Sequence, residues 1–421
     1  MQDSQADSPP QAAAAAIGSD PIEETGLTTA EVAQLLGVKR QTIYAYVSRG
    51  ILHRQMAMDG RTSRFDRSEV EALRLGRRPD TDGEMRTMLA TRLTRVSDDG
   101  LLIRGQDLVD LIDAGAGFTE VADLLWDSPA DEQWPTPDAV SSREKTRQAA
   151  PTQLTLLDQL RVIVAHESSA DPLRHDLSSK SVRAAGRRAI VAMSNGIGGG
   201  PIDQPSEVQS LGGLLLARLS STSWRPAQRR SIDVALALMA DHGLASSTFA
   251  ARIAASVRAD PYSVIAAGLG VLGGPLHGAA SGAVHGLYLA AEAQGDAAAA
   301  VGEAQRRGSL PGFGHAVYQA QDPRYGALMS QIIEAWSDDP RLQTVFRVRD
   351  VVGERSGAMP NVDLAIGALS YLAGLPADAG EAIFAIARTA GWLAHAMEEY
   401  EEKALRFRPK ARYIGNRPKA R

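Results

Sequence analysis

The stretch LPGFGHAVYQAQDPR, residues 310–324, places a histidine in a glycine- and proline-rich loop and an arginine nine residues later. Glycine adds backbone freedom and proline lacks a donor, so the Pro-Gly-x-Gly run cannot continue a helix. A loop of this kind leaves peptide N–H groups uncovered, and a ligand can approach its main chain closely. Imidazole and guanidinium groups both bind oxygen-rich anions. The stretch therefore predicts that His315 and Arg324 meet an anionic ligand.

Two further residues have the types needed for proton transfer at carbon. His277 follows Gly274 and Pro275, and because proline suits a first helical turn, the imidazole is expected near the positive end of a helix, where its neutral form is favoured. A neutral imidazole can donate a hydrogen bond to a developing enolate. Asp363 begins an apolar helical stretch, and a partly desolvated carboxylate there could serve as a general base. The alternatives are a structural histidine and an acid that interacts with the helix dipole.

A histidine and an arginine also occur inside otherwise apolar helical stretches. His242 follows Asp241 where the chain turns at Gly243, and Arg388 lies in IFAIARTAGW. Burying an arginine costs several kcal/mol unless a carboxylate or hydrogen-bond network meets it. Its planar fork is well suited to bidentate binding of a carboxylate. Arg388 is therefore a candidate ligand for a carboxylate substrate, and a structural ion pair is the alternative.

The elements that must position these residues are helices. After the polar linker GRRPDTDG the sequence is rich in Ala and Leu at helical spacing, which predicts a mostly helical body. One exception is the stretch TRVSDDGLLIRG, whose Asp-Gly turn between apolar runs predicts a hairpin. The sequence contains no Walker loop, GxSxG elbow or HExxH motif, which disfavours nucleotide hydrolysis, serine hydrolysis and zinc protease chemistry.

The order of these motifs resembles that of the citrate synthase family over roughly residues 85 to 421. The matching segments are ADHGLASST, GPLHG, PGFGHAVY with DPR, NVD, IARTAGWLAH and RFRPKARYIG. The resemblance implies a mainly α fold with a large and a small domain, and an obligate homodimer. It also implies condensation of acetyl-CoA with oxaloacetate and release of free CoA. The CoA thioester is a substrate in this chemistry, and no metal or other cofactor is expected.

The resemblance also implies a role for each candidate residue. Asp363 would remove the acetyl methyl proton, His277 would donate to the thioester oxygen, and His315 would polarise the oxaloacetate carbonyl. The residues expected to hold the oxaloacetate oxygens are His242, Arg324, Arg388 and, from the partner protomer, Arg408. The main chain expected to embrace CoA is that of Leu310, Pro311, Gly312, Phe313 and Gly314.

Two departures from the family pattern leave the activity open to more than one interpretation. Gly243 stands where the family usually has Glu, and Gly282 ends a segment in which the family has an acid. One hypothesis is an active enzyme, which could also act as a 2-methylcitrate synthase on propionyl-CoA. The other is a metabolite-sensing transcriptional regulator whose body binds oxaloacetate or acyl-CoA with little turnover. Retention of Asp363 favours the enzyme, because a sensor does not need a proton-abstracting carboxylate.

The segment from residue 26 to residue 78 has a different character. Thr28 and Glu31 form a capping-box pattern, Gly37 allows a sharp turn, and a second short helix begins near Arg40. An Asp59-Gly60 pair then predicts a hairpin turn. The segment carries a local net charge of about +5, against −5 for the whole chain, as expected for phosphate binding.

This segment resembles the winged helix-turn-helix domains of the excisionase and MerR type. The resemblance implies binding to duplex DNA. The residues expected to face the major groove are Lys39, Arg40, Gln41 and Tyr44, and those expected to contact the DNA backbone from the wing are Arg61 and Arg64. The alternative is a small helical module that contacts another protein.

Composition narrows the classes of protein that the chain can belong to. Its 421 residues are 44% hydrophobic, enough for two or three domains with a core. The sequence contains no cysteine, which excludes disulfides, thiolate catalysis and cysteine-based zinc sites. No apolar run approaches the roughly 18 to 20 residues that span a bilayer, and no signal-peptide pattern is present. We therefore expect a cytoplasmic protein that does not associate with membranes.

The predicted domain organisation follows from these patterns. The expected parts are a disordered arm over 1–25, a winged helix-turn-helix domain over 26–78, a linker over 79–84, a large domain over 85–276 and 380–421, and a small domain over 277–379.

Overall fold

The chain divides into two units in the computed structural model, Met1–Leu89 and Ala90–Arg421, and each is described by itself. The described residues are 27–48, 52, 54–56, 63–65, 70, 73, 89–98, 100–137, 154–198, 210–220, 222–274, 277–308, 310–315, 317–318 and 321–409. The predicted arm over 1–25 and the predicted linker over 79–84 lie outside these residues, as does Arg61.

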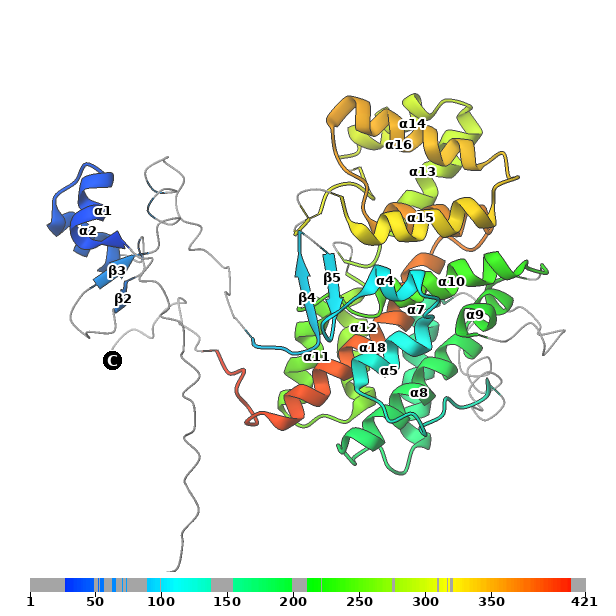
Figure 1. Cartoon of the computed structure of the whole chain (residues 1–421), viewed down its shortest axis with the longest axis horizontal. Helices are drawn as coiled ribbons and strands as arrows, with labels where there is room; N and C mark the ends of the chain where they lie inside the picture. Colours follow the sequence, from blue (N-terminus) through cyan, green and yellow to red (C-terminus); the bar gives the residue numbers. More distant parts are fainter. Residues whose placement is uncertain are drawn as a thin grey trace, which may run out of the picture. The chain divides into compact units, whose positions relative to one another are not determined.

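Among its described residues, the first unit contains the short helices α1 and α2 and a small antiparallel sheet with strand order β1-β3-β2 (Figure 1). Its elements are β1 (Leu27–Thr28), α1 (Thr29–Leu35), α2 (Arg40–Ser48), β2 (Gln55–Met56) and β3 (Ser63–Phe65). Strands β2 and β3 pair on either side of the predicted Asp59-Gly60 turn, which itself lies outside the described residues.

The start of α1 and the turn after it follow the sequence prediction. The Thr28 hydroxyl accepts a hydrogen bond from the backbone N–H of Glu31 at 3.3 Å, and the Glu31 carboxylate accepts one from the backbone N–H of Thr28 at 2.7 Å. This capping box satisfies backbone donors that have no partner inside the helix. Gly37 turns the chain with φ of +64°, a conformation that glycine adopts without strain. The apolar side chains beneath these helices are Val32, Ile43, Leu52, Phe65 and Val70, all buried.

The second unit begins with a small sheet that leads into helices. Strand β4 (Thr94–Ser97) pairs antiparallel with β5 (Gly100–Ile103), and β5 pairs with β6 (Gln106–Asp107). The hairpin predicted from the Asp-Gly turn is therefore confirmed. Asp107 then caps the next helix, because its carboxylate accepts a hydrogen bond from the backbone N–H of Val109 at 2.8 Å.

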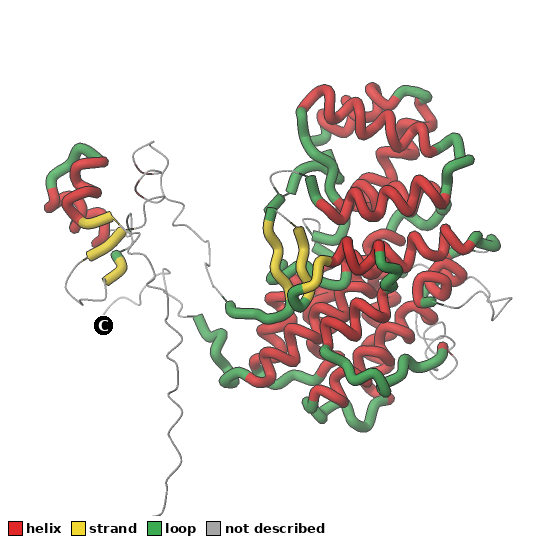
Figure 2. Tube along the Cα trace, viewed as in Figure 1, coloured by secondary structure: helices red, strands yellow, loops and turns green. Residues whose placement is uncertain are grey.

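Helices dominate the described part of the second unit after β6, which confirms the predicted mainly α fold (Figure 2). They are α4 (Leu108–Asp113), α5 (Phe118–Trp126), α7 (Leu156–Ala170), α8 (Ser179–Gly196), α9 (Leu211–Leu219), α10 (Pro226–Met239), α11 (Ser246–Ser256), α12 (Pro261–Leu272), α13 (Ala280–Gln294), α14 (Ala297–Arg306), α15 (Pro323–Ala335), α16 (Leu342–Ser356), α17 (Val362–Leu372) and α18 (Ala379–Glu401).

Helix α18 is the central element of this helical body. It packs against α5, α7, α8, α10, α11, α12, α13 and α17, and every residue from Ala382 to Ala396 is buried. A helix that is covered on all sides must be apolar all round, which explains its run of alanine, isoleucine, leucine and tryptophan. A side chain at Gly268 of α12 would lie 2.5 Å from the Trp392 ring of α18. The glycine therefore permits the close approach of these two helices.

Helices α13 to α17 pack mainly on one another, and they meet the rest of the body through α15 on α10 and through α13 and α17 on α18 (Figure 1). This arrangement brings the ends of α10, α13, α15, α17 and α18 into one region. The predicted boundary between a large and a small domain inside the body stays a prediction. No helix among the described residues combines the length and hydrophobicity needed to cross a lipid bilayer.

Candidate active site

The predicted loop over residues 310–315 lies directly against the start of α17. Phe313 and Pro360 form an isolated antiparallel bridge, and the backbone N–H of Gly314 donates to the Met359 carbonyl at 2.8 Å. The backbone N–H of Asn361 donates to the Gly312 carbonyl at 2.9 Å. These contacts hold the loop in a fixed position beside the first turn of α17.

Two glycines allow this close contact. Gly312 and Gly314 have φ of +84° and +77°, and a side chain at Gly312 would lie 3.0 Å from the Cα atom of Leu364. The amide of Asn361 also donates to the Gly314 carbonyl at 2.7 Å. Any other residue at Gly312 would combine backbone strain with a clash against α17.

Asp363 lies in the first turn of α17, where Asn361 caps the helix by accepting from the Asp363 backbone N–H at 3.0 Å. Burial raises the pKa of the Asp363 carboxyl to about 6, although Arg324 and Arg388 pull it down. A carboxylate with a pKa near the working pH is suited to accept and return a proton. The geometry therefore provides the partly desolvated acid that the sequence predicted at this position.

Arg324 is held by Asp322 at the start of α15. Its Nε and Nη2 atoms donate to the two Asp322 carboxylate oxygens at 3.0 and 2.9 Å, and both side chains are buried. The same carboxylate accepts from the backbone N–H of Val362 at 3.0 Å. Asp322 thus fixes the Arg324 guanidinium beside Asp363 and joins the starts of α15 and α17.

His315 presents one defined nitrogen to the site. Its Nδ1 atom accepts hydrogen bonds from the backbone N–H groups of Val317 and Tyr318, at 3.0 and 3.2 Å. Burial and Arg324 lower the pKa of the imidazole, so the ring is neutral and carries its proton on Nε2. This Nε2 atom lies 3.4 Å from Nη2 of Arg324. The two nitrogen atoms therefore lie side by side, where an oxygen atom of a bound anion could accept from both.

His242 lies in the turn after α10. The Asp241 carboxylate accepts from the backbone N–H of Gly243 at 3.0 Å, and Gly243 has φ of +63°, so the chain turns sharply around His242. Burial, Arg324 and Arg388 lower the pKa of His242 to about 2. The imidazole is therefore neutral and can offer a single N–H to a ligand.

His277 lies in the turn that leads into α13, as the sequence predicted. Its Nε2 atom lies 2.9 Å from the Ser247 hydroxyl, and that hydroxyl also accepts from the Trp392 indole N–H at 3.3 Å. If the serine hydroxyl donates to His277 Nε2, the ring proton lies on Nδ1 and is free for a ligand. Burial and Arg388 lower the pKa of His277, which keeps the imidazole neutral.

Arg388 comes from the middle of α18 and is 1% exposed. Its Nε atom donates to the Met239 carbonyl at 2.8 Å, and its guanidinium carbon lies 4.7 Å from the centre of the Phe384 ring. Arg388 makes no ion pair within the part of the chain that the structure describes. Burial lowers the pKa of this guanidinium to about 10. The structural ion pair considered as an alternative is therefore absent among these residues.

The predicted catalytic and binding residues lie in one site, because Arg324 and Arg388 act on the pKa values of several of them. Arg388 acts on the pKa values of His242, His277 and Asp363, and Arg324 acts on those of His242, His315 and Asp363. Six of the predicted residues are thus brought together, from the ends of α10, α13, α15 and α17, from the middle of α18 and from one loop.

Arg408 stands apart from this group within the single chain. It is exposed on the segment after α18, two residues beyond Arg406. Arg406 donates to Glu399 at 2.7 Å, and Glu399 also accepts from the buried Arg252 at 3.1 Å. The predicted contact of Arg408 with a partner protomer stays a prediction.

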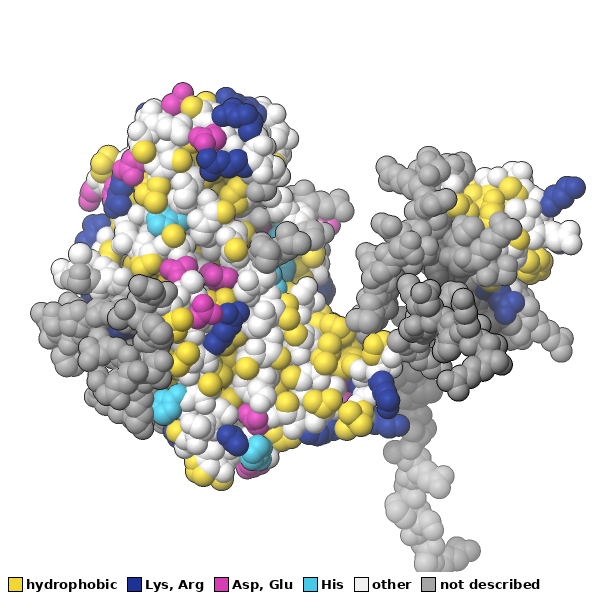
Figure 3. All heavy atoms as spheres, turned by 180° about the vertical axis from the view of Figure 1, so that it is seen from behind, with side chains coloured by type: hydrophobic (Ala, Val, Ile, Leu, Met, Phe, Trp, Pro, Cys, Tyr) yellow, Lys and Arg dark blue, Asp and Glu magenta, His cyan; other side chains and the backbone are white. Residues whose placement is uncertain are grey.

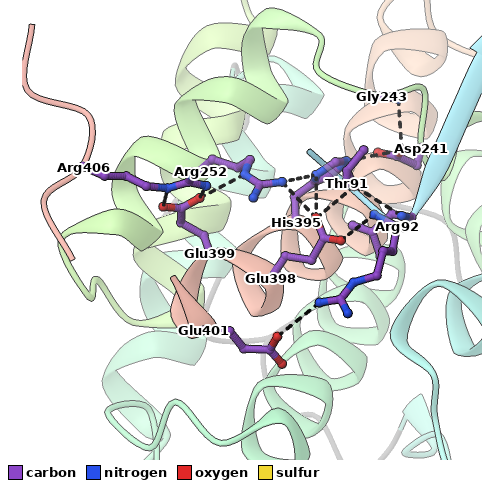
Figure 4. A network of polar contacts seen from close by, with 11 residues as sticks. Thr91, Arg92, Asp241, Gly243, Arg252, His395, Glu398, Glu399, Glu401 and Arg406 are labelled. Carbon is purple, nitrogen blue, oxygen red and sulfur yellow. Dashed lines mark hydrogen bonds and ion pairs between the residues drawn. The ribbon is translucent and has the colours of Figure 1, made fainter. Parts of the chain in front are cut away.

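A buried polar network that the sequence analysis did not identify supports the His242 turn (Figure 4). Arg252 lies 3.1 Å from His395 Nδ1, and His395 Nε2 lies 3.5 Å from the Asp241 carboxylate. Although burial raises the pKa of Asp241, His395 and Arg388 outweigh it and lower the value. An ionised Asp241 next to His242 is therefore maintained inside the body, and Figure 4 shows the network continuing to Arg406. The spacing of His395 and Glu399 on α18 was the available sequence signal.

The two glycines that depart from the family pattern fit the local packing. A side chain at Gly282 would lie 2.9 Å from the Ala377 carbonyl oxygen, so an acid could not be accommodated there without a backbone shift. At Gly243 the positive φ, rather than a lack of space, favours glycine.

Comparison with known proteins agrees with this geometry. The family profile described as "Citrate synthase, C-terminal domain" matches residues 84–410. The citrate synthase of Haloferax volcanii is 31% identical over 352 residues, which cover 76% of this chain and 91% of that protein. The chain belongs to the citrate synthase family. The 2-methylcitrate synthase 2 of Corynebacterium glutamicum is 29% identical, over 75% of this chain and 89% of that protein.

Solved structures give the same assignment for the citrate synthase body. A citrate synthase of Thermoplasma acidophilum, in a ternary complex with carboxymethyl coenzyme A and oxaloacetate, superposes with a TM-score of 0.62 at 25% identity. The match covers 80% of this chain and 96% of that one. The enzyme of Pyrobaculum aerophilum superposes with a TM-score of 0.63 at 26% identity, over 78% and 91% of the two chains.

A second family profile, described as "Helix-turn-helix domain", matches residues 27–78. The citrate synthase body is thus preceded by a helix-turn-helix domain. Citrate synthases use CoA thioesters as substrates without a further cofactor. Among the described residues, no group of three His, Asp or Glu side chains could hold a metal ion.

The raised pKa of Asp363 predicts a pH-dependent change in stability. The neutral carboxyl stabilises the fold fully below its unfolded pKa near 4, and this stabilisation is lost as the pH rises through about 6. Asp363→Asn is always neutral, so at pH 8 its free energy of unfolding should exceed that of the native chain by roughly 3 kcal/mol. Chemical denaturation at pH 4 and pH 8 measures the difference, which should fall below about 1 kcal/mol at pH 4.

Asp110→Asn is the matched control, because Asp110 also lies in a first helical turn but is exposed. It should give no gain at pH 8. A native chain that is more stable than Asp363→Asn at pH 8 contradicts the assignment of a buried, destabilised carboxylate.

Proposed function

We propose that this chain condenses acetyl-CoA or propionyl-CoA with oxaloacetate, releases free CoA, and binds duplex DNA through its helix-turn-helix domain. The observation that carries the enzymatic part is the buried Arg388, which makes no ion pair among the described residues, although Asp241 and Asp363 act on its pKa from a longer distance. Burying a guanidinium without a close counterion costs several kcal/mol. A dianionic substrate supplies the missing carboxylate, and neutral histidines around it supply single N–H donors.

The first chemical step is removal of a proton from the carbon next to the thioester carbonyl. The Asp363 carboxylate takes the proton, and the C–H electron pair moves toward the thioester carbonyl to form an enolate. The Nδ1–H of His277 donates a hydrogen bond to the thioester oxygen, where negative charge develops. Both groups are held in water-poor surroundings, which strengthens each interaction.

In the second step the enolate carbon attacks the keto carbon of oxaloacetate. The keto oxygen gains negative charge, and the neighbouring donors His315 Nε2 and Arg324 Nη2 are suited to stabilise it. His242 and Arg388 would hold the carboxylate oxygens. Hydrolysis of the thioester of the condensation product then releases free CoA.

The loop over residues 310–314 supports a role in CoA binding. Its main chain is held beside α17 by Gly312, Gly314 and Asn361, so the loop is rigid where it would meet the pantetheine arm. Glycine at these positions lets the ligand approach the backbone closely. The main chain of Leu310, Pro311 and Phe313 would complete this surface.

The proposed active unit is a homodimer in which Arg408 binds a substrate carboxylate in the partner's site. Arg406 donates to Glu399 of α18 and so fixes the start of the segment that carries Arg408. This supports a defined direction for that segment as it leaves α18. Hydrophobic side chains lie among the charged ones over the lower part of the helical body (Figure 3), as expected for a surface that another protomer covers.

The proposal for DNA rests on the exposed side of α2. Lys39, Arg40, Gln41 and Tyr44 are exposed, and the Tyr44 side chain is 54% exposed, while Ile43 on the opposite side of α2 is buried. Basic and polar side chains on one face of the second helix are what contact with a major groove requires. Arg64 lies on β3, next to the predicted wing. The alternative hypothesis, a metabolite sensor with little turnover, shares the binding residues but does not need the base.

Release of free CoA tests the enzymatic proposal directly. The native chain should release CoA from acetyl-CoA or propionyl-CoA when oxaloacetate is present. Asp363→Asn should reduce kcat by about 10³-fold, because a positioned base contributes roughly 10² to 10⁴. A thiol reagent measures the product without interference, since the chain contains no cysteine.

Asp110→Asn again serves as the control and should keep the native rate. No release above background from either acyl-CoA would rule out turnover and leave the sensor hypothesis. Equal rates for the native chain and Asp363→Asn would show that Asp363 is not the base.

Binding to duplex DNA is measured by fluorescence anisotropy at increasing salt concentration. The native chain should bind less tightly as salt rises, because basic side chains displace counterions from phosphates. The double substitution Lys39→Ala and Arg40→Ala should weaken binding by about tenfold and reduce the salt dependence. Arg307→Ala, which removes an exposed cation from the helical body, should have no effect. An affinity for DNA that changes neither with salt concentration nor with the double substitution contradicts the DNA proposal.

A further inference from the structure

Tyr318 contacts three side chains that are proposed to bind oxaloacetate, namely His242, His315 and Arg324. The sequence motifs assigned no role to Tyr318. Its hydroxyl lies 3.0 Å from His242 Nε2, and its backbone N–H donates to His315 Nδ1 at 3.2 Å. The ring centres of Tyr318 and His315 are 4.6 Å apart, and the Arg324 guanidinium carbon lies 5.9 Å from the Tyr318 ring centre. The side chain is 3% exposed.

The hydrogen bond to His242 decides what that imidazole can offer to a ligand. A neutral imidazole has one N–H donor and one bare nitrogen. If Nε2 carried the proton, it would donate to the Tyr318 oxygen, and the bare Nδ1 would repel a carboxylate. If the Tyr318 hydroxyl donates to Nε2, the proton lies on Nδ1 and is available to an anion.

We propose that Tyr318 is a positioning residue, whose hydroxyl fixes His242 as the Nδ1–H tautomer so that the ring donates to an oxygen of the dicarboxylate substrate. This inference rests on the proposed condensation with oxaloacetate.

Both partners are in the protonation states that this hydrogen bond requires. Burial raises the pKa of the Tyr318 hydroxyl to about 12, so it keeps the proton that it must donate. Burial with the nearby Arg324 and Arg388 lowers the pKa of His242, so a second ring proton is disfavoured.

Tyr318 then sets the position of the ring proton in both His242 and His315, on a different nitrogen in each. Its backbone N–H, together with that of Val317, occupies Nδ1 of His315 and leaves the proton of that ring on Nε2. Its hydroxyl occupies Nε2 of His242 and leaves the proton of that ring on Nδ1. One residue thereby makes each imidazole a donor toward the substrate.

The substitution Tyr318→Phe removes the hydroxyl and keeps the ring and the backbone. The Kd for oxaloacetate, measured by calorimetry, and its KM should both rise by roughly five- to tenfold, the usual effect of one lost hydrogen bond. The KM for the acyl-CoA should stay within about twofold. Tyr400→Phe is the matched control, because its hydroxyl donates to the Ala259 carbonyl at 2.6 Å, and it should leave both values unchanged.

Variants of His242 identify the nitrogen that carries the proton. The amide nitrogen of Asn lies near the place of Nδ1 and that of Gln near Nε2, so His242→Asn should bind oxaloacetate more tightly than His242→Gln. Adding Tyr318→Phe to His242→Ala should cause no further loss, because the hydroxyl acts through the imidazole.

Several results would overturn the inference. They are an unchanged oxaloacetate Kd in Tyr318→Phe, tighter binding by His242→Gln than by His242→Asn, and additive losses in the double variant. A native chain that does not bind oxaloacetate overturns the proposed function itself, and the inference with it.

Discussion

Two arginines buried in one helical body are the constraint on which the rest of the site depends. Arg324 is neutralised by Asp322 through two hydrogen bonds, whereas Arg388 has no ion pair among the described residues. The field of these cations, added to burial, keeps His242, His277 and His315 neutral. It also limits the rise of the Asp363 pKa to about 6. Buried guanidinium groups beside neutral imidazoles suit an anionic ligand, to which each imidazole can act as a donor.

Hydrogen bonds from neighbouring groups then determine which nitrogen of each imidazole carries the proton. Backbone N–H groups do this for His315, and in our proposal the Ser247 hydroxyl does it for His277 and the Tyr318 hydroxyl for His242. The donors are therefore oriented before the substrate arrives, which lowers the reorganisation needed in the transition state. Their supports come from segments far apart in the sequence, so the packing of α18 against its neighbours is part of the chemistry.

The sequence predicted the mainly α fold, the capping box at Thr28, the hairpin before α4 and the loop at residues 310–315, because each depends on local backbone preferences. The residues of the site could be predicted because their motifs, taken in order, resemble one family. The partners that set proton positions were not predicted. Ser247, Tyr318 and His395 meet the site through contacts between segments distant in the chain, and no local pattern encodes such contacts. The sequence likewise could not show whether Arg388 makes an ion pair, because this depends on which side chains the fold packs beside it.

Exchange of hydrogen for deuterium at the acetyl group tests the central claim most directly. The native chain is incubated in D₂O with acetyl-CoA and a dicarboxylate analogue of oxaloacetate that lacks the reactive carbonyl, so that proton removal occurs without condensation. Mass spectrometry of the recovered acetyl-CoA then counts the deuterium in its methyl group. Our account predicts incorporation with the native chain and none above background with Asp363→Asn. Equal incorporation by the two proteins would contradict the assignment of Asp363 as the base.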